Sequence, residues 1–370
     1  MPTRRQAAAT GAVLIIVLAG LAWWYSQRPV TPEGEPEYTV LANDLEVPWG
    51  LALTPEGDIL FTERGGEVKL LSGGTVNTIH TVDVHQSGEG GLLGIVLHPS
   101  FPDDPRVYIY YTYRDTGGLT WNRVTHLAFS GAQLLNETVV LDHIPAGTFH
   151  DGGRIGFGPD GKLYVTTGET GSGPLAQDPA SLAGKILRLN PDGSIPEDNP
   201  RSGSPVYSMG HRNPQGLAWH PETHELYSTE HGPSGEGLSF AHDEINVIVP
   251  GANYGWPEVI GEGDDPGYVN PVLQTGGETW APSGATFLDD PSSPWHGRLF
   301  VACLRGAGIR MVDFPPGDEQ AEVVQLYRDL GRIRTIVQGP DGYLYFCTNN
   351  RDGRGSPRQG DDIIARFKPP

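Results

Sequence analysis

The residues best suited to catalysis or ligand binding in this sequence stand at the ends of short apolar segments. His150 precedes one such segment and Glu169 follows the hairpin that begins there, while Arg212 and Arg332 precede two others. An imidazole can accept a proton near neutral pH, and guanidinium groups bind carboxylates or phosphates through paired hydrogen bonds. These residue types predict acid–base chemistry beside an anionic ligand, if the fold brings them together.

The stretch from His150 to Gly171 shows the element that carries these residues. Two short apolar strands flank a turn in which Pro159 presets φ, Asp160 bonds within the turn, and Gly161 takes a φ that other residues avoid. The same hairpin pattern occurs six times, at residues 50–64, 91–114, 153–169, 216–233, 284–306 and 334–350. The chain is therefore built from a repeated hairpin.

Each repeat leaves room for two further strands, such as residues 66–73 and 184–193. Four-stranded antiparallel sheets repeated around an axis form a β-propeller, so six copies predict an all-β fold of six four-stranded blades. The segments Tyr38 to Leu45 and Asp361 to Lys368 are expected to pair in one shared blade and close the ring. A β-sandwich is less favoured, because it would not require six matching hairpins.

The geometry of a propeller places the hairpin ends at one mouth, because each first strand starts at one face and each second strand returns to it. The residues before the first strands are Trp49, Glu89, His150 with Asp151, Arg212 with Asn213, Trp280, and Arg332 with Arg334. The residues after the second strands are Glu63 with Arg64, Glu169, Glu230 with His231, Arg305, and Asn349 with Asn350. Loop tips on a rigid scaffold commonly carry function, so this ring predicts a site for an anionic ligand.

Composition narrows the class of protein. The chain has 370 residues and a formal net charge of −20, which disfavours nucleic acid and anionic membrane surfaces as partners. Its 51 glycines and 33 prolines indicate strands and turns rather than helices. Cys303 and Cys347 are too few for a disulfide framework, and one bridge between them and two separate buried thiols both remain open.

The N-terminus carries an export signal. Arg4 and Arg5 precede an uncharged run from Ala7 to Tyr25, which is long enough to span a bilayer and ends in aromatic residues. We expect residues 1–25 to be a membrane anchor or signal segment, residues 26–37 a proline-rich linker, and residues 38–370 the propeller. Positive charge before the apolar run predicts a propeller in the periplasm or anchored to the outer face of the bacterial inner membrane.

Five motifs taken together resemble one family. They are HDGGRIGFGPDGKLYVTTGE, GEGGLLGIVLHPSF, GHRNPQGLAWHP, EHGP followed by DEINVIVPGANYGWP, and GRIRTIVQGPDGYLY. In this order they resemble the quinoprotein sugar dehydrogenases, which comprise the soluble glucose dehydrogenases and, closer to this chain, the bacterial aldose sugar dehydrogenases. The resemblance covers essentially the whole chain after the linker. It implies a six-bladed propeller that holds pyrroloquinoline quinone (PQQ) and Ca²⁺ and oxidises the anomeric carbon of aldose sugars to lactones.

The resemblance also implies roles for individual residues. His150 matches the catalytic base that takes the proton of the anomeric hydroxyl while hydride moves to the quinone. Arg212 and Asn213 match the pair beside the quinone oxygens, where positive charge stabilises the reduced cofactor. The arginines that match cofactor-carboxylate ligands, or a lysine of the soluble glucose dehydrogenases in the last case, are Arg332, Arg334 and Arg305.

The metal sites follow from the same resemblance. Gly232 and Pro233 match backbone carbonyls that bind the calcium ion linked to the cofactor, which suits a hard cation with oxygen ligands. Glu244 and Tyr254 resemble a second, structural calcium site of the aldose dehydrogenases.

Two positions depart from the soluble glucose dehydrogenases. Glu89 stands where these have glutamine, and Glu169 stands where they have aspartate. We expect Glu89 to lie near cofactor and sugar, and Glu169 to orient His150. The loops are short for the glucose-specific branch, which favours an open mouth and a broad range of aldoses.

Two other functions fit a six-bladed propeller. One is a calcium-dependent lactonase, which needs a carboxylate-rich metal centre on the axis. The other is an extracellular binding propeller without catalysis, since a fold alone does not establish activity. His150 together with the arginines favours the dehydrogenase. The electron acceptor, a quinone or a cytochrome, has no motif in the sequence.

Overall fold

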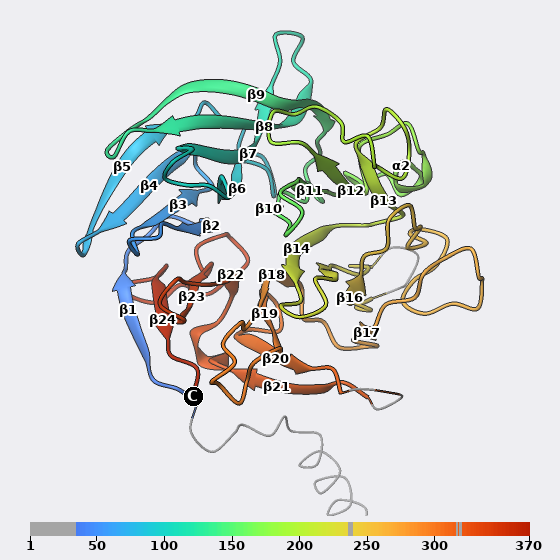
Figure 1. Ribbon diagram of the computed structural model, residues 1–370. Helices are drawn as coiled ribbons and strands as arrows, with labels where there is room; N and C mark the ends of the chain where they lie inside the picture. Colours follow the sequence, from blue (N-terminus) through green and yellow to red (C-terminus); the bar gives the residue numbers. More distant parts are fainter. Residues whose placement is uncertain (1–34, 236–239, 316, 318–319) are drawn as a thin grey trace, which may run out of the picture.

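The six hairpins form the inner halves of six four-stranded antiparallel sheets that surround a common axis (Figure 1). The computed structural model describes residues 35–235, 240–315, 317 and 320–370. In five blades of this part of the chain, the first strand of the hairpin lies innermost and later strands follow outward, whereas the sixth blade ends outward in β1. The predicted all-β, six-bladed propeller is therefore confirmed.

The strands of each blade are given from the inside outward. Blade 1 contains β2 (Pro48–Leu53), β3 (Ile59–Glu63), β4 (Glu67–Ser72) and β5 (Thr75–Thr81). Blade 2 contains β6 (Leu92–Leu97), β7 (Arg106–Arg114), β8 (Thr120–Phe129) and β9 (Leu134–Pro145). Blade 3 contains β10 (Ile155–Phe157), β11 (Leu163–Thr167), β12 (Lys185–Leu189) and β13 (Val206–Met209). Blade 4 contains β14 (Pro214–Trp219), β15 (Leu226–Glu230), β16 (Glu244–Val247) and β17 (Leu273–Gln274). Blade 5 contains β18 (Pro282–Phe287), β19 (Leu299–Cys303), β20 (Ile309–Asp313) and β21 (Glu322–Leu326). Blade 6 contains β22 (Ile333–Gln338), β23 (Leu344–Thr348), β24 (Ile364–Phe367) and β1 (Tyr38–Ala42).

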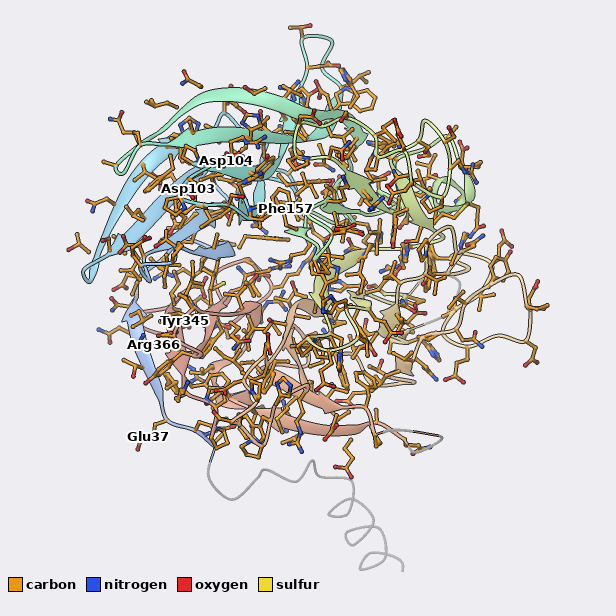
Figure 2. The ribbon with its side chains drawn as sticks, viewed as in Figure 1. Glu37, Asp103, Asp104, Phe157, Tyr345 and Arg366 are labelled. Atoms are coloured by element: carbon orange, nitrogen blue, oxygen red, sulfur yellow. The ribbon has the colours of Figure 1, made fainter. Side chains whose placement is uncertain are left out.

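The last blade closes the ring as predicted. Its outermost strand is β1, which pairs antiparallel with β24 so that Tyr38 lies opposite Phe367. Figure 1 shows the two strands side by side although they come from opposite ends of the propeller sequence. Between β24 and β23, Arg366 donates a hydrogen bond to the hydroxyl of Tyr345 at 2.9 Å (Figure 2).

The hydrophobic core lies between neighbouring blades. Trp49, Leu93 and Ile155, from the innermost strands of blades 1 and 3 and of the blade between them, pack in one cluster of buried side chains. Buried apolar surface between sheets holds the ring together, so each hairpin end has a fixed place around the axis.

The two cysteines are not bridged. Cys303 on β19 and Cys347 on β23 are both free and buried, which decides between the two possibilities left open by the sequence. Burial raises the pKa of each thiol to about 12, so both behave as small hydrophobic side chains.

The expected anchor at residues 1–25 and most of the linker lie outside the described residues. Within the described ranges, no helix is long and apolar enough to cross a membrane. The helical segments there are α2 (Pro174–Gln177) and the 3₁₀ turn η2 (Arg328–Leu330).

Candidate active site

A pocket of about 560 Å³ opens at one mouth of the propeller. Its walls come from loops of five blades, which is the convergence that the hairpin pattern predicts. The predicted site residues that line it are Glu89, His150, Arg212, Arg305 and Arg332.

His150 is oriented by Glu169, which lies behind the pocket wall. The Nδ1 atom of His150 contacts the Oε1 atom of Glu169, and only 3% of the Glu169 side chain is exposed. An ionised carboxylate only accepts hydrogen bonds, so this contact favours the tautomer with hydrogen on Nδ1. The other ring nitrogen, Nε2, is thereby left as a proton acceptor. The expected orienting role of Glu169 is consistent with this geometry.

The backbone at His150 has a φ of 62°, in the left-handed region that residues other than glycine rarely adopt. Its N–H donates a hydrogen bond to the Oε2 atom of Glu89 at 3.0 Å. Burial opposes ionisation of Glu89, yet hydrogen bonds from Arg354 and from His150, with the charges of His231 and Arg354, lower the pKa of Glu89 to about 2. Glu89 is therefore a fixed negative charge beside the histidine loop.

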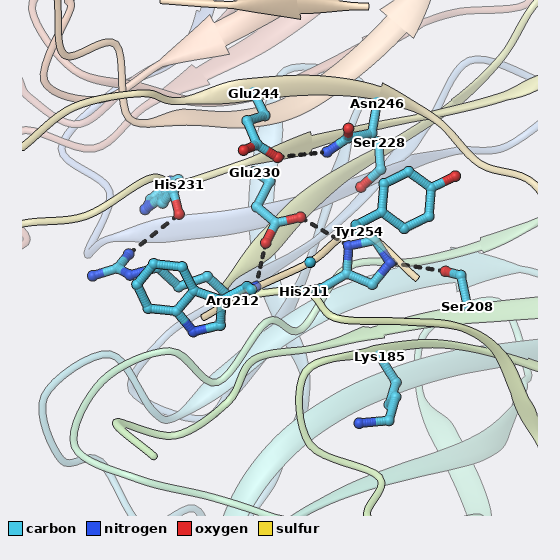
Figure 3. A network of polar contacts seen from close by, with 12 residues as sticks. Lys185, Ser208, His211, Arg212, Ser228, Glu230, His231, Glu244, Asn246 and Tyr254 are labelled. Carbon is cyan, nitrogen blue, oxygen red and sulfur yellow. Dashed lines mark hydrogen bonds and ion pairs between the residues drawn. The ribbon is translucent and has the colours of Figure 1, made fainter. Parts of the chain in front are cut away.

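Arg212 and Asn213 lie together before β14. Arg212 is buried and donates to the carbonyl of His231 at 3.2 Å (Figure 3). Its guanidinium lies 5.3 Å from the ring centre of Trp256. Asn213 accepts a hydrogen bond from Gly152 at 3.1 Å. Within the described part of the chain, neither the Nδ2 atom of Asn213 nor the Nε2 atom of His231 has a hydrogen-bond partner. Buried polar atoms of this kind call for a ligand or water.

The other arginines divide into a pocket pair and a deeper residue. Arg305 is exposed to the pocket, and the described residues offer its guanidinium no hydrogen bond. Arg332 is held by Asp352, with its Nη2 atom 2.6 Å from the carboxylate. Arg334 does not line the pocket, because it is buried among the innermost strands, where it donates to Gln215 at 2.6 Å. Burial lowers the pKa of Arg334 to about 10.

The predicted metal ligands surround a second, smaller cavity. Gly232, Pro233, Glu244 and Tyr254 all line it, and Arg212 and His231 border both this cavity and the main pocket. The residues expected from the sequence to form two calcium sites thus lie around one cavity. Glu230 lines it too and was not assigned a role from the sequence.

Two buried acidic side chains, Glu230 and Glu244, line the smaller cavity. Burial and the neighbouring Glu230 raise the pKa of Glu244, which accepts hydrogen bonds from Asn246 at 3.0 Å and Gly261 at 3.2 Å. Glu230 is itself held by His211 at 2.8 Å (Figure 3). The residues that the structure describes contain no group of three or more His, Cys, Asp or Glu side chains placed to hold a metal ion.

Several residues of the pocket wall were not predicted from the sequence, and Phe149 and Arg354 are the two that bear on His150. Phe149 is 49% exposed beside His150, and Arg354 lines the pocket from the loop after β23. The signal for Arg354 was its nearness to the last hairpin tip, in the segment RDGRG, which also carries Asp352. Its partner Glu89 lies 265 residues away in the sequence.

Fold and site together define a class of protein: a six-bladed propeller whose mouth carries a carboxylate-oriented histidine in a pocket bordered by arginines. The family model for glucose/sorbosone dehydrogenases matches residues 45–358, and the chain belongs to this family.

Individual relatives agree with this assignment. The aldose sugar dehydrogenase of Escherichia coli K12 is 33% identical over 376 residues, which cover 94% of this chain and 98% of that protein. A Thermus thermophilus oxidoreductase described as a glucose dehydrogenase has a similar structure, with a TM-score of 0.83, 46% identity, and coverage of 90% of this chain and 99% of that one. The PQQ-bound aldose sugar dehydrogenase of Streptomyces coelicolor follows with a TM-score of 0.80, 38% identity, and coverage of 91% and 99%.

Proposed function

We propose that this protein is a PQQ-dependent aldose sugar dehydrogenase that oxidises the anomeric carbon of aldoses to lactones. The observation that carries the proposal is His150, with its Nδ1 atom bound to buried Glu169, on the wall of a pocket that Arg212, Arg305 and Arg332 also line. Relatives described as aldose sugar dehydrogenases, one of them in its PQQ-bound form, support it.

The pocket fits such a cofactor. PQQ carries carboxylates and quinone oxygens, which need cationic partners and hydrogen-bond donors. Arg305 and Arg332 line the pocket and are suited to the carboxylates. The Nδ2 atom of Asn213 is a buried donor with no partner among the described residues, and Arg212 adds a positive charge at the wall. Arg334 is not among the pocket-lining residues and is instead bonded to Gln215.

The chain supplies the acid–base part of the reaction. When bound, PQQ supplies the acceptor for the hydride that leaves the anomeric carbon. His150 takes the proton of the anomeric hydroxyl at Nε2, so the sugar loses one hydride and one proton and becomes a lactone. Glu169 keeps the ring in the required tautomer and stabilises the imidazolium once it carries the proton. Arg212 places positive charge where negative charge develops.

The proposal includes calcium. Gly232, Pro233, Glu244 and Tyr254 line one cavity, and the first two would bind the ion through their backbone carbonyls, as the family resemblance implies. Oxygen donors with negative charge nearby are the ligands that Ca²⁺ prefers. Bound there, the ion would favour the ionised form of Glu244, whose pKa burial and Glu230 otherwise raise.

The lactonase alternative has less support. It requires a cluster of carboxylates that can hold a metal on the axis, and across the described ranges no such cluster of three is present. The buried groups among the inner strands include Arg154 and Arg334, which are cations. A binding propeller without catalysis leaves the contact between His150 and Glu169 without a purpose.

For its location, we propose the periplasm or the outer face of the inner membrane, since Arg4 and Arg5 precede the apolar run of residues 7–25. The electron acceptor is proposed to be a quinone or a cytochrome. Fractionation of cells that produce the full chain would test the location, and recovery of the protein in the cytosol would contradict it.

The function is tested with the full chain, a dye as electron acceptor and a panel of aldoses, with and without added PQQ and Ca²⁺. We expect dye reduction only with both additions. His150→Ala should lower kcat by roughly 10²- to 10⁴-fold, the usual contribution of a general base, while PQQ binding measured by calorimetry persists.

A matched control is His80→Ala, which removes a histidine from β5, the outermost strand of blade 1, and should leave kcat unchanged. Failure of PQQ to bind, or full activity of His150→Ala, would contradict the proposed function.

A further inference from the structure

A side chain from blade 6 bonds to a side chain from blade 2 in the pocket wall. Arg354, in the segment that connects β23 with β24, donates from Nη1 to the Oε1 atom of Glu89 at 2.8 Å. The Arg354 side chain is half exposed and lines the pocket, whereas only 16% of the Glu89 side chain is exposed. The pair therefore joins two non-adjacent blades across the pocket rim.

The second oxygen of Glu89 points to the catalytic loop. Its Oε2 atom accepts the backbone hydrogen bond from His150 at 3.0 Å, so one carboxylate connects Arg354 with the backbone of the histidine. The Arg354 guanidinium also lies 5.9 Å from the ring centre of Phe149. Phe149 and His150 are thus held together from the side of the pocket rim.

His150 needs such support because its backbone is left-handed, with a φ of 62°. A residue other than glycine in this region costs on the order of 1 kcal/mol and keeps the conformation only when its surroundings impose it. The other backbone contact, from Thr170 N–H to the His150 carbonyl, is long at 3.3 Å. The hydrogen bond to Glu89 is therefore the shorter of the two.

The same loop also connects to the arginine of the pocket wall. The Arg354 N–H donates to the Oδ1 atom of Asp352 at 2.8 Å, and the Oδ2 atom of Asp352 holds Arg332 at 2.6 Å. A continuous series of hydrogen bonds runs from Arg332 through Asp352, Arg354 and Glu89 to His150.

We propose that Arg354 is a positioning residue for His150, acting through Glu89 to fix the backbone of the histidine where its ring can take the proton from the sugar. The role in turnover rests on the proposed function, whereas the structural part holds for the protein without cofactor. Nothing about Arg354 in this role requires contact with the sugar.

The structural test uses the protein without added cofactor. A proton shared between His150 Nδ1 and a carboxylate gives a low-field proton resonance, which is assigned by its loss in His150→Ala. We expect Arg354→Gln to shift or broaden this resonance, because the backbone of His150 loses its support. Arg358→Gln is the matched control, since it removes an exposed arginine from the same loop. It should leave the resonance unchanged.

The kinetic test separates positioning from sugar binding. Arg354→Gln should lower kcat about tenfold, as expected for a misplaced catalytic group, with KM changed less than about twofold. Arg354→Lys keeps a cation for Glu89 and should recover much of the loss. The double variant Glu89→Gln/Arg354→Gln should have a kcat no lower than that of the less active single variant, because both substitutions remove the same contact.

Three results would overturn the proposal: an unchanged resonance in Arg354→Gln, a raised KM with unchanged kcat, or additive effects of the two substitutions. If Arg354→Gln does not fold, Glu89→Gln alone must move the resonance. A resonance that moves in a protein that oxidises no aldose would leave the positioning role standing and remove the proposed function instead.

Discussion

Asp151, next to His150, is a carboxyl group in an unfavourable place. It is 1% exposed, and burial raises its pKa to about 6 although Asn122 and Gly147 each donate to its Oδ1 atom at 3.0 Å. Its Oδ2 atom has no hydrogen-bond partner in the described part of the chain. Between the unfolded pKa near 4 and about pH 6, the folded state therefore keeps a proton that the unfolded state has released.

This difference sets the sign of a pH effect. Because the folded state binds more protons in that window, the contribution of Asp151 to stability is present below about pH 4 and is lost as the pH rises through 6. Asp151→Asn stays uncharged and still accepts both hydrogen bonds. We expect the variant to gain stability relative to the natural protein from pH 4 to pH 7, by at most about 3 kcal/mol.

Thermal unfolding at a series of pH values measures this gain. The same substitution at exposed Asp103 controls for the loss of one charge. A stability difference between Asp151→Asn and the natural protein that is independent of pH would contradict the assignment.

At the level of single residues, position along a hairpin was predictable and depth was not. His150, Arg212 and Arg305 reach the pocket because each stands next to a hairpin strand. Arg334 lies only two residues after Arg332, yet it is buried among the inner strands. The sequence pattern does not say how far along the axis a residue lies.

The inner strands depend on glycine because they approach one another closely. A Cβ atom on Gly94 of β6 would lie 2.3 Å from the carbonyl oxygen of Gly153, and one on Gly216 of β14 would lie 2.4 Å from that of Ser283. Real Cβ atoms do not come so near to a backbone oxygen, so these strands leave no room for a side chain.

Gly94→Ala tests this requirement. The methyl group must push β6 away from the segment before β10, which should cost about 1–3 kcal/mol, as overpacking of a core does. Gly277→Ala is the control, because a Cβ there meets nothing within 4 Å among the described residues. Thermal unfolding of both variants measures the effect. Equal melting temperatures for the two would contradict the close packing of the inner strands.

The inner hairpins were predictable from the sequence, but several outer elements were not. Turns such as Pro159–Asp160–Gly161 mark the hairpins locally. The outer strand β17 has only two residues, Leu273–Gln274, after a long irregular segment that follows β16. Two residues give no periodicity, so the pairing of β17 with β16 comes from the fold around it.

At the scale of the molecule, the ring is held by one pairing between distant strands. Val40 of β1 lies opposite Ala365 of β24, and Tyr38 packs edge-on against Tyr327 at 5.7 Å and against Phe346 at 6.2 Å. Without β1, β24 would become an exposed sheet edge.

A chain that begins at residue 43 tests the closure against one that begins at residue 35, which keeps all of β1. We expect the shorter chain to melt roughly 5 °C or more below the longer one, since it loses a row of hydrogen bonds and the packing of Tyr38. Calorimetry measures the difference, and equal melting temperatures would show that β1 does not hold the ring.

The pairing of β1 with β24 also determines when the ring can close during synthesis of the chain. The strand of the propeller that leaves the ribosome first has its partner in the strand that leaves last. Each inner hairpin can form as soon as it emerges, but blade 6 stays incomplete, with its edges unprotected, until Phe367 has been added. Newly made molecules therefore pass through a stage in which β1 and β24 are not yet paired. In this stage a chaperone or an export machinery can still bind the chain before the ring closes.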